Sequence, residues 1–409
     1  MITVDDDYSE IAEKVEAGQR LTREEGIRLF DADLFTLGAL ANQVRERMHG
    51  DAAYYTHTLH LNYSNGCVLS CGLCAFYRPL DHKEAYTFSL EEIARKAETA
   101  GKLGVREFHI TGGLNPRLPF DYYEEMFRTL KKIVPAATVK AFTSVEIDFF
   151  SKLYRLSVDE VFQRLKAAGM DCMPGGGAEI LAKRVRNIIC PEKISGERWI
   201  EVQQQAHLHG LPTNATMLYG HVETIEERVD HMLAIRALQE ETLRQACLSG
   251  RQACLSGRQA QGGAGVQAFV PLSYHAEGTA FPDLPPTTGF EDLKVYAVSR
   301  LVLDNVPHIK LLWTYVGTKM IQVALDFGVD DVGSTNMEER IVKAAGANHY
   351  DAPSVDDLTD MIQKAGRTPQ LIDSLYGAES VIPAKAGIRR RPHANEDPRL
   401  CEDDLRSLS

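Results

Sequence analysis

The 409-residue sequence has no apolar run near the about 18 residues that a membrane-spanning helix needs, and it has no surplus of basic residues. Its net charge of −12 argues against general binding to nucleic acids or membrane surfaces, because such binding requires clustered lysine and arginine. The first residues carry neither the basic nor the apolar region of a signal peptide. With eight cysteines and no export signal, we expect a cytoplasmic protein with free thiols.

Three of the cysteines stand close together in HLNYSNGCVLSCGLCAFYR, residues 60–78. Cys67, Cys71 and Cys74 have the spacing C-x3-C-x2-C and follow an apolar run typical of a strand. Three thiolates on one short loop can bind three irons of a 4Fe–4S cluster. No fourth cysteine is near, so one iron would keep an open coordination position, which is where a metal site binds a substrate or cofactor.

Other uses of the three cysteines stay open. A structural zinc site usually has two pairs of ligands, and no second Cys or His pair follows at zinc-finger spacing. A redox dithiol needs only two cysteines and a thioredoxin-like context, which the sequence does not show. A non-catalytic iron–sulfur electron carrier would normally supply a fourth cysteine and has no need of a large domain.

From residue 57 onward, short apolar segments alternate with amphipathic ones. Capping patterns such as Ser89-x-x-Glu92 and Ser157-x-x-Glu160 predict the starts of helices. The repeated alternation over roughly 280 residues favours an α/β fold of the closed (βα)8 TIM-barrel type, with a doubly wound open sheet as the alternative. In a barrel, the cysteine loop and the glycine-rich turns would all lie at the C-terminal ends of the strands. The expected strands are 57–63, 107–111, 138–143, 170–173, 213–218, 266–272, 309–315 and a weak segment near Val332.

The chain divides into four expected regions. We expect an N-terminal helical segment over 1–50, a barrel over 51–347, C-terminal helices over 348–378 and a disordered tail over 379–409, since the tail has little apolar content. The loop 244–265 contains the tandem repeat RQACLSG-RQACLSG-RQA, which we interpret as a local duplication in a surface loop. We assign no function to its cysteines, Cys247 and Cys254.

Six stretches of the chain form a recognisable set: HLNYSNGCVLSCGLCAFYR, TGGLNPRLPFDYYEEM, KAFTSVEIDFFSKL, MPGGGAEI, TNATMLYGHVET and VSRLVLDN. Together they resemble the aminodeoxyfutalosine synthase family of radical S-adenosylmethionine (SAM) enzymes, which serves the futalosine route to menaquinone. The resemblance covers roughly residues 20–375, without the repeat and the tail. Cyclic dehypoxanthine futalosine synthase, a radical SAM enzyme of the same pathway, shares several of these stretches, but KAFTSVEIDFFSKL favours the former.

The resemblance implies a 4Fe–4S cluster, SAM as co-substrate and an external one-electron donor such as a flavodoxin or ferredoxin. The reaction would add the 5′-deoxyadenosyl radical to 3-[(1-carboxyvinyl)oxy]benzoate, and rearrangement with decarboxylation would give 6-amino-6-deoxyfutalosine. The substrate is an aromatic dicarboxylate, so cationic or hydrogen-bonding groups should surround its site.

The resemblance also implies roles for individual residues. Cys67, Cys71 and Cys74 would hold the cluster. The Gly-Gly-Glu segment of the radical SAM superfamily corresponds to Gly112 and Gly113 followed by Leu114, so only backbone atoms remain there to contact SAM. The acids could equally start helices, and the glycines could equally form tight turns. The expected SAM-binding residues are Phe76, Gly112, Gly113, Glu146, Gly175, Gly176 and Glu179, and the expected substrate-binding residues are Asn214, Thr216, His221, His275 and Tyr315.

Overall fold

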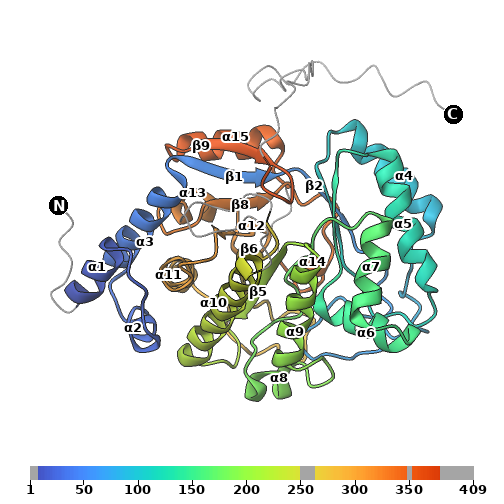
Figure 1. Ribbon diagram of the computed structural model, residues 1–409, viewed down its shortest axis with the longest axis horizontal. Coiled ribbons are helices and arrows are strands. Elements are labelled where there is room, and N and C mark those ends of the chain that lie inside the picture. The colour runs from blue at the N-terminus through green and yellow to red at the C-terminus, as the bar shows by residue number, and fades with distance from the viewer. Residues whose placement is uncertain (1–7, 249–262, 348–351, 378–409) are drawn as a thin grey trace, which may run out of the picture. The chain divides into compact units, whose positions relative to one another are not determined.

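The computed structural model describes residues 8–248, 263–347 and 352–377 (Figure 1). The expected tail over 379–409 and most of the tandem repeat lie outside these residues. Among the described helices, none is long and apolar enough to cross a membrane. The described strands are β1 (Ala52–Thr56), β2 (Thr58–Leu61), β3 (Glu107–Ile110), β4 (Thr138–Ala141), β5 (Thr213–Tyr219), β6 (Val266–Ser273), β7 (His308–Ile309), β8 (Asp331–Ser334) and β9 (Thr368–Ile372).

The strands form a closed parallel barrel, which confirms the predicted fold class. Three sheets with the orders β8-β1-β9, β2-β3-β4 and β5-β6-β7 are parallel throughout. Isolated parallel bridges join them into a ring: Lys140 to Cys172 and Met173 to Thr213 connect β4 with β5, Lys310 to Asp331 connects β7 with β8, and Leu59 to Met337 connects β2 with the residues after β8.

Helices cover the outside of the barrel, and in Figure 1 α1–α3 (blue) lie on the side opposite to α4–α7 (cyan to green). Side chains of Ser89, Thr143 and Ser157 cap α4, α6 and α7 in reciprocal capping boxes with the glutamates at the third helical position. The N-terminal helix α3 packs against α11. The helices are α1 (Ser9–Glu16), α2 (Arg23–Arg28), α3 (Leu34–His49), α4 (Leu90–Lys102), α5 (Phe120–Ile133), α6 (Ser144–Tyr154), α7 (Val158–Ala168), α8 (Lys183–Ile189), α9 (Gly196–Leu208), α10 (Ile225–Leu248), α11 (Gly289–Val302), α12 (Trp313–Val316), α13 (Lys319–Ala324), α14 (Ile341–Ala344) and α15 (Val355–Lys364).

Some elements differ from the expected ones. The first barrel strand starts earlier than residue 57 and is split into β1 and β2 at His57, whose carbonyl accepts from the N–H groups of both Arg106 and Glu107. The expected strand 170–173 is reduced to single bridges. The apolar run 309–315 turns into α12, because the buried Trp313 donates its indole N–H to Ser334 O at 2.7 Å and holds the chain there.

The region 348–378, expected as helices, contains α15 and then the strand β9 among its described residues. Residues 368–372 pair with β1 in parallel register from Ala52↔Thr368 to Thr56↔Ile372. The strand β9 forms on the edge of β1 that β8 leaves open. The hydrophobic periodicity of the C-terminal region, which is helical up to Lys364, does not reveal that edge. This corrects the prediction for the C-terminal region.

The residues after β9 close the N-terminal end of the barrel. Ser374 accepts from Thr138 Oγ1 at 2.7 Å and donates to Glu107, the first residue of β3. Tyr376 donates its hydroxyl to Asp331 Oδ2 at 2.5 Å, and its ring stacks on His308 with centroids 3.7 Å apart. Both residues are buried, so this segment seals the barrel opposite to the cysteine loop.

Candidate active site

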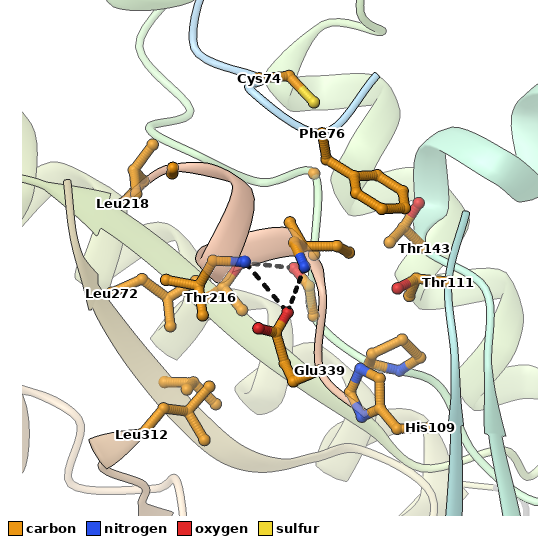
Figure 2. A pocket seen from close by; sticks show the side chains of 18 of the residues that line it. Cys74, Phe76, His109, Thr111, Thr143, Thr216, Leu218, Leu272, Leu312 and Glu339 are labelled. Atoms are coloured by element: carbon orange, nitrogen blue, oxygen red, sulfur yellow. Dashed lines mark hydrogen bonds between the residues drawn. The ribbon is translucent and has the colours of Figure 1, made fainter. Parts of the chain in front are cut away.

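The C-terminal ends of the strands surround a cavity of ≈ 350 Å³ (Figure 2). Cys74 and Phe76 lie at one end of this cavity, and Leu312 and His109 lie at the other (Figure 2). Its wall contains every residue predicted for the site except His221. The predicted residues that it contains are Cys67, Cys71, Cys74, Phe76, Gly112, Gly113, Glu146, Gly175, Gly176, Glu179, Asn214, Thr216, His275 and Tyr315.

Backbone hydrogen bonds fix the cysteine loop against the turn after β3. Val68 N donates to Leu114 O at 3.0 Å, and Gly113 N donates to Ser64 O at 2.7 Å. A Cβ on Gly113 would lie 2.4 Å from Gly66 O, so only glycine allows this close approach. Leu69 N points at Cys67 Sγ at 3.4 Å, the kind of N–H donor that stabilises a metal-bound thiolate.

The three cysteines suit a cluster better than a single ion. Sulfurs around one tetrahedral zinc lie roughly 3.8 Å apart, given a Zn–S distance of about 2.3 Å. Among the described residues, the group of three potential ligands with its ligand atoms within 4.8 Å of one another is His49, His308 and Asp330, not the cysteines. The wider cysteine spacing fits a cluster in which each sulfur binds a different iron.

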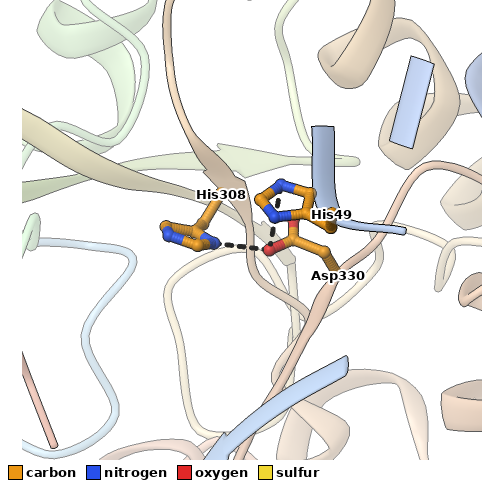
Figure 3. Close-up of side chains that lie close together, drawn as sticks. All are labelled: His49, His308 and Asp330. Atoms are coloured by element: carbon orange, nitrogen blue, oxygen red, sulfur yellow. Dashed lines mark hydrogen bonds and ion pairs between the residues drawn. The ribbon is translucent and has the colours of Figure 1, made fainter. Parts of the chain in front are cut away.

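The His49–His308–Asp330 group lies at the opposite, N-terminal end of the barrel (Figure 3). Arg300 donates to Asp330 Oδ1, which also accepts from Ile309 N at 2.8 Å, and His308 Nδ1 bonds Oδ2 at 2.5 Å. His49 Nε2 donates to Pro307 O at 2.9 Å. The arginine already supplies the positive charge that a metal ion would bring, so this group has a structural explanation.

A buried ion pair lies beside the cysteine loop. Lys193 Nζ donates to Glu179 Oε1 at 2.5 Å. Burial acts to raise the pKa of Glu179, but the charge of Lys193 more than offsets it and holds that pKa below its ordinary value. Because Lys193 also lines the cavity, it brings a positive charge to the wall next to Cys71 that the sequence analysis did not identify.

The glycine-rich turn 174–177 packs directly on β5. A Cβ on Gly175 would lie 2.6 Å from Ala215 Cα, and Thr216 Oγ1 donates to Gly175 O at 2.8 Å. Trp199 donates its indole N–H to Gly176 O at 3.2 Å. These glycines are therefore required for the packing of the turn, and their backbone atoms also face the cavity.

Glu146 is engaged with the protein itself. Its Oε1 accepts from Gly112 N at 3.0 Å and from Tyr63 OH at 3.1 Å, and its Oε2 accepts from Thr143 N at 2.8 Å. Burial raises the pKa of Glu146 to about 7 although these hydrogen bonds act to lower it. The observed bonds give Glu146 a positioning role for the Gly112 turn, while a contact to ribose stays a prediction.

The two predicted histidines differ in their placement. His221 does not line the cavity: its Nε2 donates to Leu218 O at 2.9 Å, and its Nδ1 lies 2.9 Å from Glu223. The substrate-binding prediction for His221 is therefore corrected, since the side chain supports the loop after β5. His275 does face the cavity, and its Nε2 donates to Tyr315 O at 3.0 Å.

The floor of the cavity is polar, and the sequence analysis did not predict it. His60 of β2, His109 of β3 and Lys140 of β4 are register partners in one row, and the two imidazoles stack with centroids 4.7 Å apart. Lys140 pairs with Glu107 at 2.7 Å, and Lys310 pairs with Asp331 at 2.9 Å. Polar residues in the middle of otherwise apolar strands were the signal that could have identified this row.

Burial controls the charge of this floor. It lowers the pKa of His60 to about 3 and also lowers the pKa of His109, so both rings are neutral near pH 7. Because each lysine of the floor has a carboxylate partner, the floor carries paired charges and a flat, neutral imidazole surface.

Comparisons with known proteins agree with this geometry. The radical SAM superfamily model matches residues 61–235, and the model of the CofH/MqnC C-terminal region matches residues 263–384. An aminodeoxyfutalosine synthase of Thermus thermophilus is 43% identical over 371 residues, which cover 90% of this chain and 94% of the relative. A 5-amino-6-(D-ribitylamino)uracil–L-tyrosine 4-hydroxyphenyl transferase of Methanosarcina acetivorans is 37% identical over 87% of this chain and 90% of its own. A cyclic dehypoxanthine futalosine synthase of Streptomyces coelicolor is 36% identical over 89% and 86% of the two chains.

Solved structures show the same fold at low identity. Methylornithine synthase matches with a TM-score of 0.65 at 14% identity, covering 88% of this chain and 96% of its own. The hydrogenase maturase HydG from Carboxydothermus hydrogenoformans matches with a TM-score of 0.66 at 16% identity, covering 90% and 80%.

Proposed function

The chain belongs to the radical SAM superfamily, and from this premise we propose that it is an aminodeoxyfutalosine synthase. It adds the 5′-deoxyadenosyl group of SAM to 3-[(1-carboxyvinyl)oxy]benzoate and, after rearrangement and loss of carbon dioxide, forms 6-amino-6-deoxyfutalosine. The observation that carries this proposal is the 43% identity to the Thermus synthase over nearly the whole of both chains. The position of the three cysteines in the wall of the barrel cavity also supports this proposal.

The chain's own residues bind and orient the partners. Cys67, Cys71 and Cys74 would hold the 4Fe–4S cluster, which when bound supplies the electron that cleaves SAM. The turns at Gly112–Gly113 and Gly175–Gly176 let the backbone approach SAM closely, because neither turn has room for a Cβ. Leu218, Leu272 and Leu312 line the interior (Figure 2) and exclude water from the reacting groups.

The remaining predicted residues divide between the two ligands. Phe76 and Glu179 lie on the wall near the cysteine loop and contact SAM, whereas Asn214, Thr216, His275 and Tyr315 contact the aromatic dicarboxylate. A reduced flavodoxin or ferredoxin supplies the electron from outside.

The second candidate is the cyclase, favoured by a 36% identical relative of that activity. The two reactions differ in the fate of the adenosyl group, because the synthase builds it into the product and the cyclase releases 5′-deoxyadenosine.

The test is anaerobic reconstitution followed by turnover with adenosyl-labelled SAM and the enol-ether benzoate. We expect mass spectrometry to find the label in a product that contains both the adenosyl and benzoate parts, with carbon dioxide released in equal amount. Release of labelled 5′-deoxyadenosine from SAM when dehypoxanthine futalosine is supplied, with no coupling to the benzoate, would instead establish the cyclase.

A further inference from the structure

The segment that follows β8 brings two unassigned polar residues, Asn336 and Glu339, to the cavity. A turn links them, because Glu339 N donates to Asn336 O at 3.3 Å. The backbone is strained here: Asn336 has φ +46° and Glu338 has φ +59°, a region that residues other than glycine rarely adopt. Strain of this kind, held next to a binding cavity, indicates that the exact placement of these side chains matters.

Glu339 is 7% exposed and has one engaged and one unengaged oxygen. Its Oε1 accepts from Ile341 N at 2.6 Å and from Val342 N at 3.1 Å, the first N–H groups of α14. Its Oε2 has no hydrogen-bond partner among the described residues. Figure 2 shows the carboxyl group inside the cavity, between Thr216 on one side and His109 on the other.

Asn336 repeats this pattern at the other end of the turn. The side chain is 5% exposed, and its Oδ1 accepts from Ser334 Oγ and from His60 Nε2, each at 2.8 Å. Its Nδ2 has no partner among the described residues. A buried polar atom without a partner costs the fold the full desolvation of that group, so two of them on one cavity wall indicate a ligand that pairs with both.

We propose that Asn336 and Glu339 bind one carboxylate of the aromatic dicarboxylate substrate, with Asn336 donating through Nδ2–H and Glu339 donating as a neutral acid through Oε2–H. This inference rests on the proposed function. Burial raises the pKa of Glu339 and more than offsets the two backbone hydrogen bonds to Oε1, which act to lower that pKa, and the unengaged Oε2 is left to carry the proton.

The charges around the cavity support neutral donors for this carboxylate. Lys140 and Lys310, which reach the floor, are already paired with Glu107 and Asp331. Burial raises the pKa of Glu339, which favours its protonated form.

The groups that face Glu339 come from several elements. They are Lys343 of α14, Tyr315 of α12 and, on the floor of the cavity, His60 and His109. Burial raises the pKa of Tyr315 far above neutrality, and it keeps both imidazoles uncharged. Among these groups, Glu339 is the carboxyl group that burial shifts towards its protonated form, so loss of that proton as the pH rises would remove its donor.

The experiment measures binding of 3-(carboxymethoxy)benzoate, a non-reactive dicarboxylate analogue, to the reconstituted holoenzyme by calorimetry at several pH values, together with KM for the enol-ether benzoate. For the wild type, we expect Kd to rise with pH as Glu339 loses its proton. E339Q keeps a donor at this position, so its Kd stays within about threefold of the wild-type value at neutral pH and no longer varies with pH. E339A and N336A remove a donor and weaken binding roughly tenfold or more.

The matched control is E338Q in the same turn, because Glu338 pairs with Lys96 outside the cavity and its replacement leaves Kd unchanged. Unchanged Kd in both alanine variants would overturn the proposal. So would wild-type binding that tightens as the pH rises, because an ionised Glu339 has no proton to donate to the carboxylate of the analogue. If the wild type fails to couple SAM to the benzoate, the proposed function fails, and the Kd values of the analogue still report separately on these two residues.

Discussion

At the scale of single residues, Cys71 and Cys190 are a natural pair for comparison. Both are buried cysteines near Lys193, but Cys71 lines the cavity and Cys190, at the end of α8, does not. We expect Cys71→Ala to lose the cluster, because two remaining thiolates cannot hold three irons. Iron and sulfide analysis after anaerobic reconstitution should fall from about four irons per chain towards zero.

Cys190→Ala serves as the control and should retain full iron content. Iron loading equal to that of the wild type in Cys71→Ala would show that Cys71 is not a ligand. Loss of iron in both variants would mean that Cys190 takes part as well, which the geometry of the cavity wall contradicts.

The cysteine motif could be predicted because its chemistry lies in a short, contiguous pattern. His60, His109 and Lys140 could not be predicted so readily, since they come from three strands and meet only through the register of the sheet. Glu339 lies in the irregular segment between β8 and α14, and only the unpaired state of its Oε2 identifies it. Which polar atoms lack a hydrogen-bond partner becomes visible only once the chain is folded.

At the scale of elements, the turn after β3 and the cysteine loop depend on each other. The Cβ of Gly113→Ala would meet Gly66 O at 2.4 Å, so one of the two backbone segments must move. We expect weaker SAM binding, by roughly tenfold or more in Kd, because a shift of about 1 Å at a site of this kind typically costs that much or more. Calorimetric titration of the reconstituted protein with SAM measures this Kd.

Gly289→Ala is the comparison, because an added Cβ at the start of α11 meets only the flexible end of Met320 at 3.2 Å. It should bind SAM as the wild type does. Equal SAM affinity in both alanine variants would contradict the proposed role of the Gly113 turn.

Helices were predicted more accurately than strands, for a local reason. Capping boxes at Ser89 and Ser157 fix helix starts through neighbouring residues only. The strand β9 depends instead on a free edge of β1 some 300 residues away in sequence, roughly the separation given by Ala52 and Thr368. The run 309–315 contains apolar residues that suit either state, and the anchor of Trp313 on Ser334 decides it.

At the scale of the whole molecule, buried histidines make stability depend on pH. Burial lowers the pKa of His49 to about 4 and the pKa values of His60, His207 and His231 to about 3. The unfolded chain takes up these protons near pH 6.5 and the folded chain does not, so lowering the pH favours unfolding. Each histidine removes ~1.4 kcal/mol of unfolding free energy per pH unit below about pH 6.

Glu146 acts in the opposite direction, since its raised pKa of about 7 means that the folded chain binds a proton first. One such group does not offset four histidines. Urea denaturation between pH 7 and about pH 4.5 should therefore show a steep loss of stability. H207Q removes the imidazole between Thr213 and Thr242. In this variant, the slope of the unfolding free energy against pH should be shallower by the uptake of one proton. A slope identical to that of the wild type would show that His207 titrates normally in the folded chain.

Among the described residues, the segment around Ser374 and Tyr376 closes the N-terminal end of the barrel and leaves the cavity bordered by the cysteine loop at the other end. We therefore expect both substrates to enter and the product to leave at the cysteine-loop end, and the proposed reaction joins parts of two substrates into one molecule. Because the product combines parts of both substrates, we expect product release, rather than bond formation, to limit the rate of turnover.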